Sequence, residues 1–220
     1  MPTSTVEDYL KCIHREERSG QGRLVSTGRI AQEMCVAPGT VTAMMKTLTE
    51  SGLVEYEPYM GVRLTDHGCK LATHVLRRHR LVELFLVRIM GMDWSKVHAE
   101  AEILEHAVSD RLIDRMDEML GHPKADPHGD PIPTSAGSLE ESDDPSLLVC
   151  DLNHDLKITR VTDQRTGFLQ LLEQHRLMPG RHAVVENRDE LTETVQVRPA
   201  GGEPLRLGFQ AASRILVGKD

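Results

Sequence analysis

Residues 26–65 of the chain read STGRIAQEMCVAPGTVTAMMKTLTESGLVEYEPYMGVRLT. Ser26 and Thr27 are residue types that cap helices, so they predict a short helix over residues 28–34. Pro38, in the turn that follows, suits the first turn of a second helix. Within that second helix, apolar residues recur at the spacing i, i+3, i+4 and i+7, which indicates one buried face: Val41, Met44, Met45 and Leu48.

The segments on either side complete a known order of elements. Gly52 ends the second helix, and residues 53–56 and 62–65 are short apolar runs around a turn with a glycine, which indicates a hairpin. Upstream, residues 9–17 have apolar side chains at helical spacing. Three helices followed by a hairpin are the order of a winged helix-turn-helix, in which the second helix of the motif enters the major groove of DNA.

Composition restricts the class of protein. Apolar residues make up 39% of the 220 and charged residues 27%, as in soluble globular proteins, and the net charge of −8 argues against binding nucleic acid by bulk charge alone. The longest apolar stretch, residues 81–92, is broken by Glu83 and Arg88 and is too short to span a bilayer. The chain starts without a signal-peptide pattern, and its four cysteines form no CxxC pair. We therefore expect a cytoplasmic protein with no membrane partner.

The remainder of the chain has two further patterns. Residues 69–90 and 95–120 show helical periodicity, whereas residues 148–220 alternate as short strands around one helix. Between them, residues 123–147 contain five prolines, six acidic residues and one basic residue, which favours an extended, solvated path. The expected strands are residues 148–152, 156–161, 182–186, 194–198, 205–209 and 215–217.

These patterns predict a multi-domain protein that is mainly α with a small β-barrel. The order is a winged helix-turn-helix, a helical domain, a linker and the barrel. The expected bounds are 1–67 for the DNA-binding domain, 68–133 for the helical domain, 134–147 for an acidic, Pro-rich linker and 148–220 for the barrel.

The predicted reading helix, residues 38–51, begins with small side chains that let its backbone approach base edges. We expect its first turn to contact bases, and two nearby cations to contact phosphates. Because basic residues are few, affinity would have to come from dimerisation and close fit. The alternative is a pair of ordinary packed helices. The candidate DNA-binding residues are Arg29, Pro38, Gly39, Thr40, Thr42 and Lys46.

A second pattern lies in residues 98–106, HAEAEILEH. At about 100° per residue, four side chains share one arc of the helix: His98, Glu102, Glu105 and His106. His79 and Glu83 are likewise four residues apart on the preceding helix. Carboxylates and imidazoles on facing helices are how helical bundles bind first-row metals. The alternative is a solvated polar face, but no Lys or Arg shares the arc to balance its acids.

Seven stretches, in one order over about residues 5–133, indicate a relationship to known proteins. They resemble the diphtheria-toxin-repressor family of iron-dependent repressors, and residues 148–220 resemble, more loosely, the SH3-like domain of its longer members. The resemblance implies a homodimer that binds palindromic operator DNA when it holds metal. The stretches are Glu7-Asp8-Tyr9-Leu10, Val41-Thr42, Ser51-Gly52-Leu53-Val54, Leu64-Thr65-Asp66-His67-Gly68, Arg78-His79-Arg80-Leu81-Val82-Glu83, residues 96–106 and Pro127-His128-Gly129-Asp130-Pro131-Ile132-Pro133.

The resemblance also implies two metal ions per subunit, in positions that match two sets of residues in this chain. Iron-sensing members have thioether and thiol ligands where this chain has Asp8 and Glu102. Carboxylates stand there in manganese-sensing members, and hard oxygen ligands suit Mn(II), so the chain resembles a manganese-sensing member. Where the short manganese sensors have a second carboxylate, this chain has Lys11, whose positive charge would repel a pair of metal ions. The set of His79, Glu83 and His98 is therefore expected to replace the paired-metal geometry of those sensors. The two sets are Asp8, Glu102, Glu105 and His106, and His79, Glu83 and His98.

We therefore expect a repressor that controls metal homeostasis, and not an enzyme. Without metal, Asp8, Glu102 and Glu105 would repel one another. A divalent ion would neutralise them and tether the first helix to the helix over residues 95–120, which sets the two reading helices of a dimer about 34 Å apart. The sequence has no catalytic motif such as HExxH and implies no organic cofactor. The alternatives are an Fe(II)-responsive repressor and a winged-helix regulator that senses an organic ligand.

Overall fold

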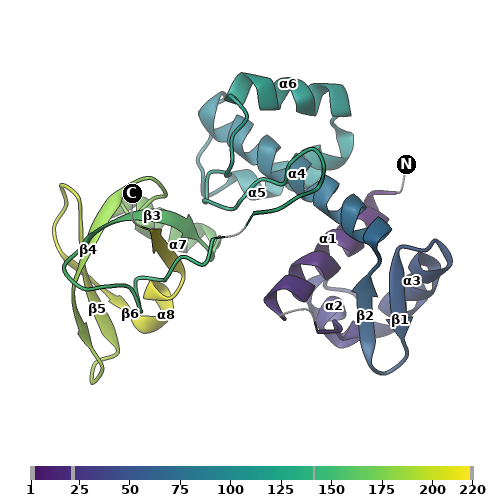
Figure 1. The fold of residues 1–220 in the computed structure, drawn as a ribbon, viewed down its shortest axis with the longest axis horizontal. Coiled ribbons are helices and arrows are strands. Elements are labelled where there is room, and N and C mark those ends of the chain that lie inside the picture. Colours follow the sequence, from purple (N-terminus) through teal and green to yellow (C-terminus); the bar gives the residue numbers. More distant parts are fainter. Residues whose placement is uncertain (1–2, 21–22, 141, 219–220) are drawn as a thin grey trace. The chain divides into compact units, whose positions relative to one another are not determined.

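The computed structural model describes residues 3–20, 23–140 and 142–218. Its internal contacts divide the chain into two units, Met1–His79 with Pro133–Leu139, and Arg80–Ile132 with Glu140–Asp220. The division falls inside one long helix, α4 (Asp66–Arg88), which begins in the first unit and ends in the second (Figure 1). Among the described residues, no helix combines the length and the apolar character needed to cross a membrane.

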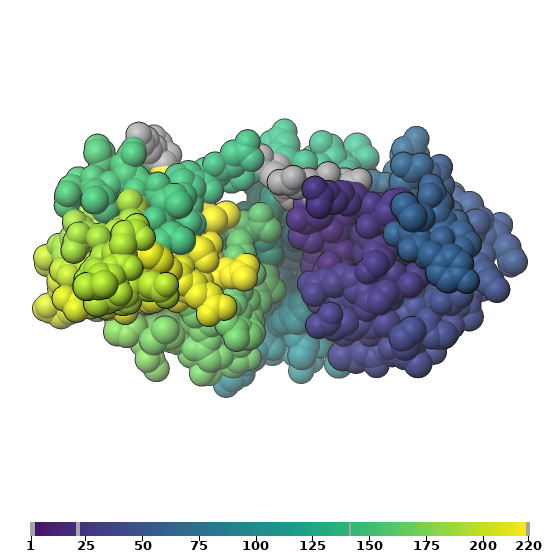
Figure 2. All heavy atoms as spheres, turned by 90° about the horizontal axis from the view of Figure 1, so that it is seen from below, coloured from purple at the N-terminus to yellow at the C-terminus, as the bar shows by residue number. Residues whose placement is uncertain are grey.

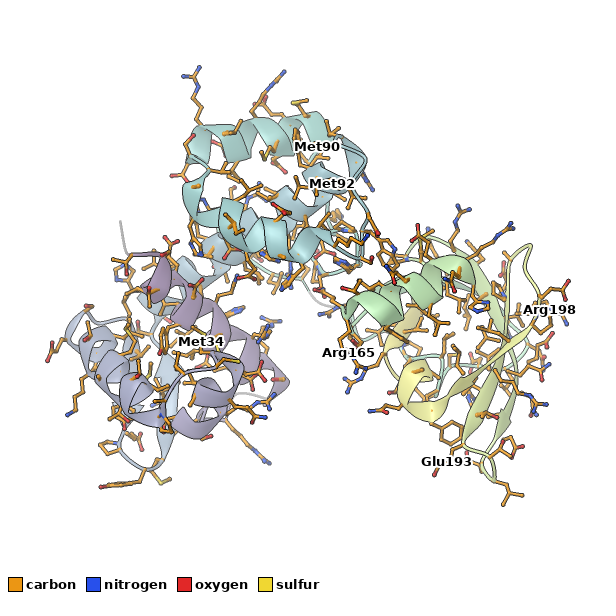
Figure 3. The ribbon with its side chains drawn as sticks, turned by 180° about the vertical axis from the view of Figure 1, so that it is seen from behind. Met34, Met90, Met92, Arg165, Glu193 and Arg198 are labelled. Atoms are coloured by element: carbon orange, nitrogen blue, oxygen red, sulfur yellow. The ribbon has the colours of Figure 1, made fainter. Side chains whose placement is uncertain are left out.

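The first unit is a winged helix-turn-helix, as predicted. The Ser26 hydroxyl accepts a hydrogen bond from the Arg29 amide at 3.2 Å and so caps the second helix, and Pro38 is the first residue of the third. Aliphatic side chains of the helices meet in one core, against which Met34 packs (Figure 3). The elements are α1 (Ser4–Ser19), α2 (Thr27–Glu33), α3 (Pro38–Glu50), β1 (Val54–Glu57) and β2 (Gly61–Leu64).

The β1–β2 hairpin is held against the segment that precedes α2. Val25 and Val62 pair through two backbone hydrogen bonds of 2.8 and 2.9 Å. A Cβ at Gly61 would lie 2.7 Å from the Val25 carbonyl oxygen, so this close approach requires glycine. Backbone contacts therefore fix the wing to the helix-turn-helix.

The second unit begins with the end of α4, followed by α5 (Val97–Ala107) and α6 (Asp110–Leu120). The prediction of one helix over residues 95–120 is wrong. Val108 has an extended backbone (φ −78°, ψ 130°), and Ser109 starts a new helix as its N-cap residue. Serine before aspartate is a helix-start signal, but the apolar periodicity on both sides conceals it.

Residues 126–132 form a buried turn between α6 and the sheet. Oδ1 of Asp126 accepts hydrogen bonds from the amides of His128 and Asp130, at 2.8 and 2.9 Å. The side chains of all three residues are buried. The extended, solvated path expected for residues 123–147 is therefore wrong for this part, because an aspartate that bonds nearby amides can fold a polar segment into a tight turn.

The rest of the second unit is an antiparallel sheet in the order β6-β5-β4-β3-β7, which has the predicted SH3-like character (Figure 1). The strand expected over residues 148–152 is instead a turn, in which the amides of Val149 and Cys150 bond to the Ser146 carbonyl. Ser146 also pairs with Leu216. The elements are β3 (Asp155–Val161), α7 (Thr166–Gln174), β4 (His182–Asp189), β5 (Thr194–Pro199), β6 (Leu205–Gly208), α8 (Phe209–Ala212) and β7 (Ile215–Gly218).

Trp94 joins the helical part of the second unit to its sheet. This residue lies between α4 and α5 and is buried in the aliphatic core of the sheet. Its ring stacks on the ring of His128, with centroids 5.5 Å apart. Next to His128, a Cβ at Gly129 would overlap the backbone of Thr159 on β3. The buried turn is therefore packed directly against the sheet.

Candidate metal centre and nucleic-acid interface

Glu83 is a deeply buried candidate ligand on α4. Only 1% of its side chain is exposed, and its Oε1 atom is 3.1 Å from Nδ1 of His98 on α5. Its Oε2 atom is 3.7 Å from Nδ1 of His128 in the buried turn. His79 precedes Glu83 by one turn of the same helix. One carboxylate therefore stands between two imidazole rings that come from different segments.

α5 places three further candidate ligands after His98. Nε2 of His98 is 3.6 Å from Oε1 of Glu102, one turn further along. Glu105 is fully buried, and its Oε1 atom is 3.3 Å from Nε2 of His106. Ile103, which lies between Glu102 and Glu105 in the sequence, is 69% exposed. Here the helix buries a carboxylate and exposes an apolar side chain, which is the reverse of an ordinary solvated face.

A group that the sequence does not single out lies beside Glu83. Glu83, Asp126 and His128 each offer a ligand atom within 4.8 Å of the others, and all three residues are buried. Nδ1 of His128 and Oδ2 of Asp126 have no hydrogen-bond partner among the described residues. The Nε atom of Arg80 is 3.9 Å from Oδ2 of Asp126, which is too far for a hydrogen bond. Because buried polar atoms are nearly always paired, this arrangement fits a cation.

The hydrogen bonds of His128 show which of its ring atoms could bind a cation. Nε2–H of His128 donates to the carbonyl oxygen of Trp94 at 3.0 Å, so in the neutral ring the Nδ1 lone pair is available to a cation. Burial, and after it the charges of Asp130 and Glu83, raise the pKa of Asp126 to about 7. Cation binding at Asp126 would therefore displace a proton from the carboxyl group near neutral pH.

The predicted metal ligands divide between the two units. In the second unit, the distances above join most of them in pairs: Glu83, His98, Glu102, Glu105 and His106. Asp8 lies half-buried on α1 in the first unit, and its place beside Glu105 and His106 stays a prediction.

Sequence reasoning misses Asp126 and His128 as candidate ligands. Their composition is that of a solvated linker, and their spacing to Glu83 along the chain has no fixed pattern. The available signal is the Pro127-His128-Gly129-Asp130-Pro131 motif, which resembles the family's pattern without implying a ligand. Only the folded turn shows that these side chains face α4.

The predicted DNA-binding residues belong to the first unit, which forms a continuous purple to blue surface in Figure 2. Thr42 is half-buried, and its hydroxyl donates to the Pro38 carbonyl at 3.1 Å. Arg29 pairs with Glu16 at 2.8 Å and with Glu33 at 3.0 Å, both within the unit. The remaining candidates are exposed on α3: Pro38, Gly39, Thr40 and Lys46.

Fold and site together define a class of protein. A winged helix-turn-helix is followed by helices with buried carboxylate–imidazole pairs and by an SH3-like sheet. This combination is that of a DNA-binding regulator controlled by a metal.

Comparison with known proteins identifies the family. Residues 1–62 match the N-terminal DNA-binding domain of the iron dependent repressors, and residues 65–134 match their metal-binding and dimerisation domain. The chain belongs to the iron-dependent repressor family, as its sequence motifs predict. It is a metal-dependent transcriptional regulator and not an enzyme.

Relatives and solved structures agree with this assignment. An uncharacterised HTH-type transcriptional regulator of Methanocaldococcus jannaschii is 36% identical over 114 residues, which are 52% of this chain and 90% of that protein. The iron-dependent repressor IdeR of Mycobacterium tuberculosis is 34% identical over 148 residues, which are 66% of this chain and 64% of that protein. The structure of a manganese-dependent transcriptional repressor in complex with manganese has a TM-score of 0.85 and 36% identity, and the match covers 98% of this chain and 100% of that one.

Proposed function

We propose that the chain is a manganese-dependent repressor, which binds palindromic operator DNA as a homodimer in the cytoplasm when it is loaded with Mn(II). One observation carries this proposal: the potential metal ligands that gather among the described residues are carboxylates and imidazoles, with no cysteine. Such donors suit Mn(II), whereas thiolates select softer metals. A solved structure that matches almost the whole chain is of a repressor in complex with manganese, which supports the same choice. Fe(II) is the alternative.

Two metal positions follow from the donor groups. We assign the first to Asp8, Glu102, Glu105 and His106. We build the second around Glu83, with His79 and His98 on one side of it or Asp126 and His128 on the other. The second choice has the stronger support, because its unpartnered Oδ2 and Nδ1 atoms are buried and within reach of Glu83.

In this proposal, metal dependence arises from the carboxylates of α1 and α5. Glu105 is fully buried, so the approach of a second carboxylate, Asp8, is unfavourable on electrostatic grounds. A bound divalent ion would supply the positive charge that offsets both. Asp8 would then hold α1 in one orientation. Because α1 packs in the same core as α2 and α3, its orientation would affect theirs. A coupling of about 1–3 kcal/mol between metal and DNA is usual and must be reciprocal.

The homodimer needs a contact surface, and the helical part of the second unit has exposed apolar side chains that could form one. It exposes more large apolar side chains than isolated surface residues would account for. We propose that this face, which includes Met90 (Figure 3), contacts the second subunit. Its residues are Ile89, Met90, Ile103, Leu112 and Met119.

The test of the proposal is operator affinity with and without metal. Duplexes are first selected from a random library by the Mn(II)-loaded protein, and the affinity of the selected duplex is then measured in chelator and in Mn(II). We expect Mn(II) to tighten binding by about 5- to 150-fold. Equal affinity in both conditions contradicts the proposal.

Metal identity is tested by ranking the responses to Mn(II), Fe(II) and Zn(II). Because hard ligands favour manganese, Glu102→Cys should move the preference away from Mn(II). An unchanged ranking in this variant contradicts the argument from ligand type.

A further inference from the structure

The last turn of α1 bears two adjacent carboxylates that bond to different parts of the first unit. Glu16 accepts a hydrogen bond from Nε–H of Arg29 on α2 at 2.8 Å. Glu17 accepts one from the backbone amide of Leu64, the last residue of β2, also at 2.8 Å. Since neighbouring side chains on a helix point about 100° apart, a single turn of α1 reaches both the helix-turn-helix and the wing.

Arg29 belongs to a chain of four charged side chains that joins α1 to α2. Its guanidinium is 3.0 Å from Glu33, one turn further along α2. Glu33 is in turn 2.8 Å from Arg15 on α1, and Glu16 completes the chain. The charges alternate in sign. Arg29 therefore directs its charge at two carboxylates within the unit, where it is poorly placed to contact a phosphate.

These bonds differ in kind from the apolar contacts of α1. Leu10 and Ile13 are buried in the core, but apolar contact is non-directional and allows a helix to rotate or shift slightly. A carboxylate that accepts from a backbone amide is directional, and such charge-assisted bonds are stronger than neutral ones. Glu17 is also half-buried; burial raises its pKa, and the Leu64 amide and the charge of Arg63 act against this.

We infer that Glu16 and Glu17 are positioning residues, which fix α1 against α2 and the wing so that a displacement at the metal-binding end of α1 reaches the DNA-reading elements. Asp8 and Glu17 are nine residues apart on one uninterrupted helix, or about 14 Å. The inference rests on the proposed function, in which α1 responds to metal through Asp8. To the proposed function, the inference adds the contacts through which α1 acts on the DNA-reading elements. It also assigns Arg29 to an ion pair with Glu16.

The test separates metal binding from its effect on DNA. For the full chain and each variant we measure Mn(II) affinity without DNA by electron paramagnetic resonance, operator affinity in chelator, and operator affinity in saturating Mn(II). Glu17→Ala should leave the first two within about twofold and remove most of the stimulation of DNA binding by Mn(II). Glu17→Gln keeps an oxygen that can accept from the Leu64 amide, so it should retain most of the stimulation. Glu173→Ala, at an exposed position of α7, is the control.

Arg29→Gln distinguishes a positioning role from direct binding to a phosphate. If Arg29 neutralised one phosphate in each subunit of a dimer, the substitution would reduce the slope of log K against log salt concentration by about 2. If Arg29 instead holds Glu16, the salt slope in chelator stays unchanged and the stimulation by Mn(II) falls.

Three results for Glu17→Ala would overturn the inference: stimulation equal to that of the wild type, equal loss of DNA binding with and without metal, or a parallel loss of Mn(II) affinity. If circular dichroism shows that Glu17→Ala does not fold, the salt slope and stimulation of Arg29→Gln decide. A wild type that binds Mn(II) without any stimulation contradicts the proposed function itself, so the two failures are distinguishable.

Discussion

Single residues determine what the candidate centre can bind, and Glu83 illustrates how. Its two oxygens face Nδ1 atoms of two different histidines, His98 and His128, and almost none of its surface reaches solvent. A buried carboxylate is unfavourable unless a positive charge balances it. A divalent cation provides that balance at any pH at which the imidazoles are neutral, so the stability of this region should depend on metal.

The first prediction concerns the site proposed on α5. Glu102→Ala and His106→Ala should abolish the stimulation of DNA binding by Mn(II), because each removes a ligand from the position that includes Asp8. Both residues are only partly buried, so the fold should persist. Operator affinity in chelator and in Mn(II) checks the effect, and circular dichroism checks the fold. A normal metal response in either variant would show that the assignment is wrong.

The second prediction decides which residues accompany Glu83. His128→Gln should reduce the number of Mn(II) ions bound per subunit from two to one, whereas His98→Gln should not, because we favour the group of Glu83, Asp126 and His128. Glutamine keeps a side chain of similar size against Trp94. Equilibrium dialysis against Mn(II) gives the count. If His98→Gln reduced the count and His128→Gln did not, the second ion would instead be assigned to His79, Glu83 and His98.

At the scale of elements, the sequence predicts those helices and strands whose ends are determined by nearby residues. The helices and hairpin of the first unit are specified by caps, glycines and apolar spacing within a few residues of each boundary, such as Ser26 and Pro38. The break at Val108 is missed because the helical apolar period continues on both sides of it. The strand expected over residues 148–152 is wrong because its apolar residues belong to a turn that packs on β7.

The buried turn of residues 126–132 depends on information that is not local. Asp126 and His128 look like parts of a linker until the Asp126 carboxylate bonds two backbone amides and the turn packs against Trp94 and β3. The same limit applies to the candidate site. Helical spacing predicts that His98, Glu102, Glu105 and His106 share a face of one helix, but it does not predict what that face meets.

The third prediction tests how tightly this turn packs. Gly129 has a φ of +86°, and a Cβ there would overlap the backbone of Thr159. Gly129→Ala should therefore destabilise the metal-free protein by at least about 2 kcal/mol. Urea unfolding followed by circular dichroism measures the change.

The matched control for this prediction is another glycine of the second unit. Gly167 lies in α7 with no other atom within 4 Å of an added Cβ. Gly167→Ala should stabilise the protein by about 0.5–1 kcal/mol, because alanine restricts the unfolded chain. Equal effects of the two substitutions would mean that the turn is not confined against the sheet.

At the scale of the whole molecule, the fourth prediction concerns assembly. Leu112→Lys should weaken the dimer, because it places a charge in the proposed apolar contact face. Leu191→Lys, in the turn between β4 and β5, replaces a side chain that is 94% exposed and should have no such effect. Sedimentation velocity over a range of concentrations compares the two.

Metal binding by the Leu112→Lys subunit should persist, whereas binding to a palindromic duplex should weaken, because both half-sites must be engaged together. If Leu112→Lys remained fully dimeric, α6 would not belong to the contact face.

The position of Trp94 has a practical consequence. It is the one indole in the chain, and it stacks on the ring of a candidate metal ligand while it fills the core of the SH3-like sheet. Native indole emission therefore comes from a single fluorophore, whose surroundings change when a cation binds at His128 or when the second unit unfolds. A paramagnetic ion such as Mn(II) in this vicinity should quench that emission, so titrations need no added label.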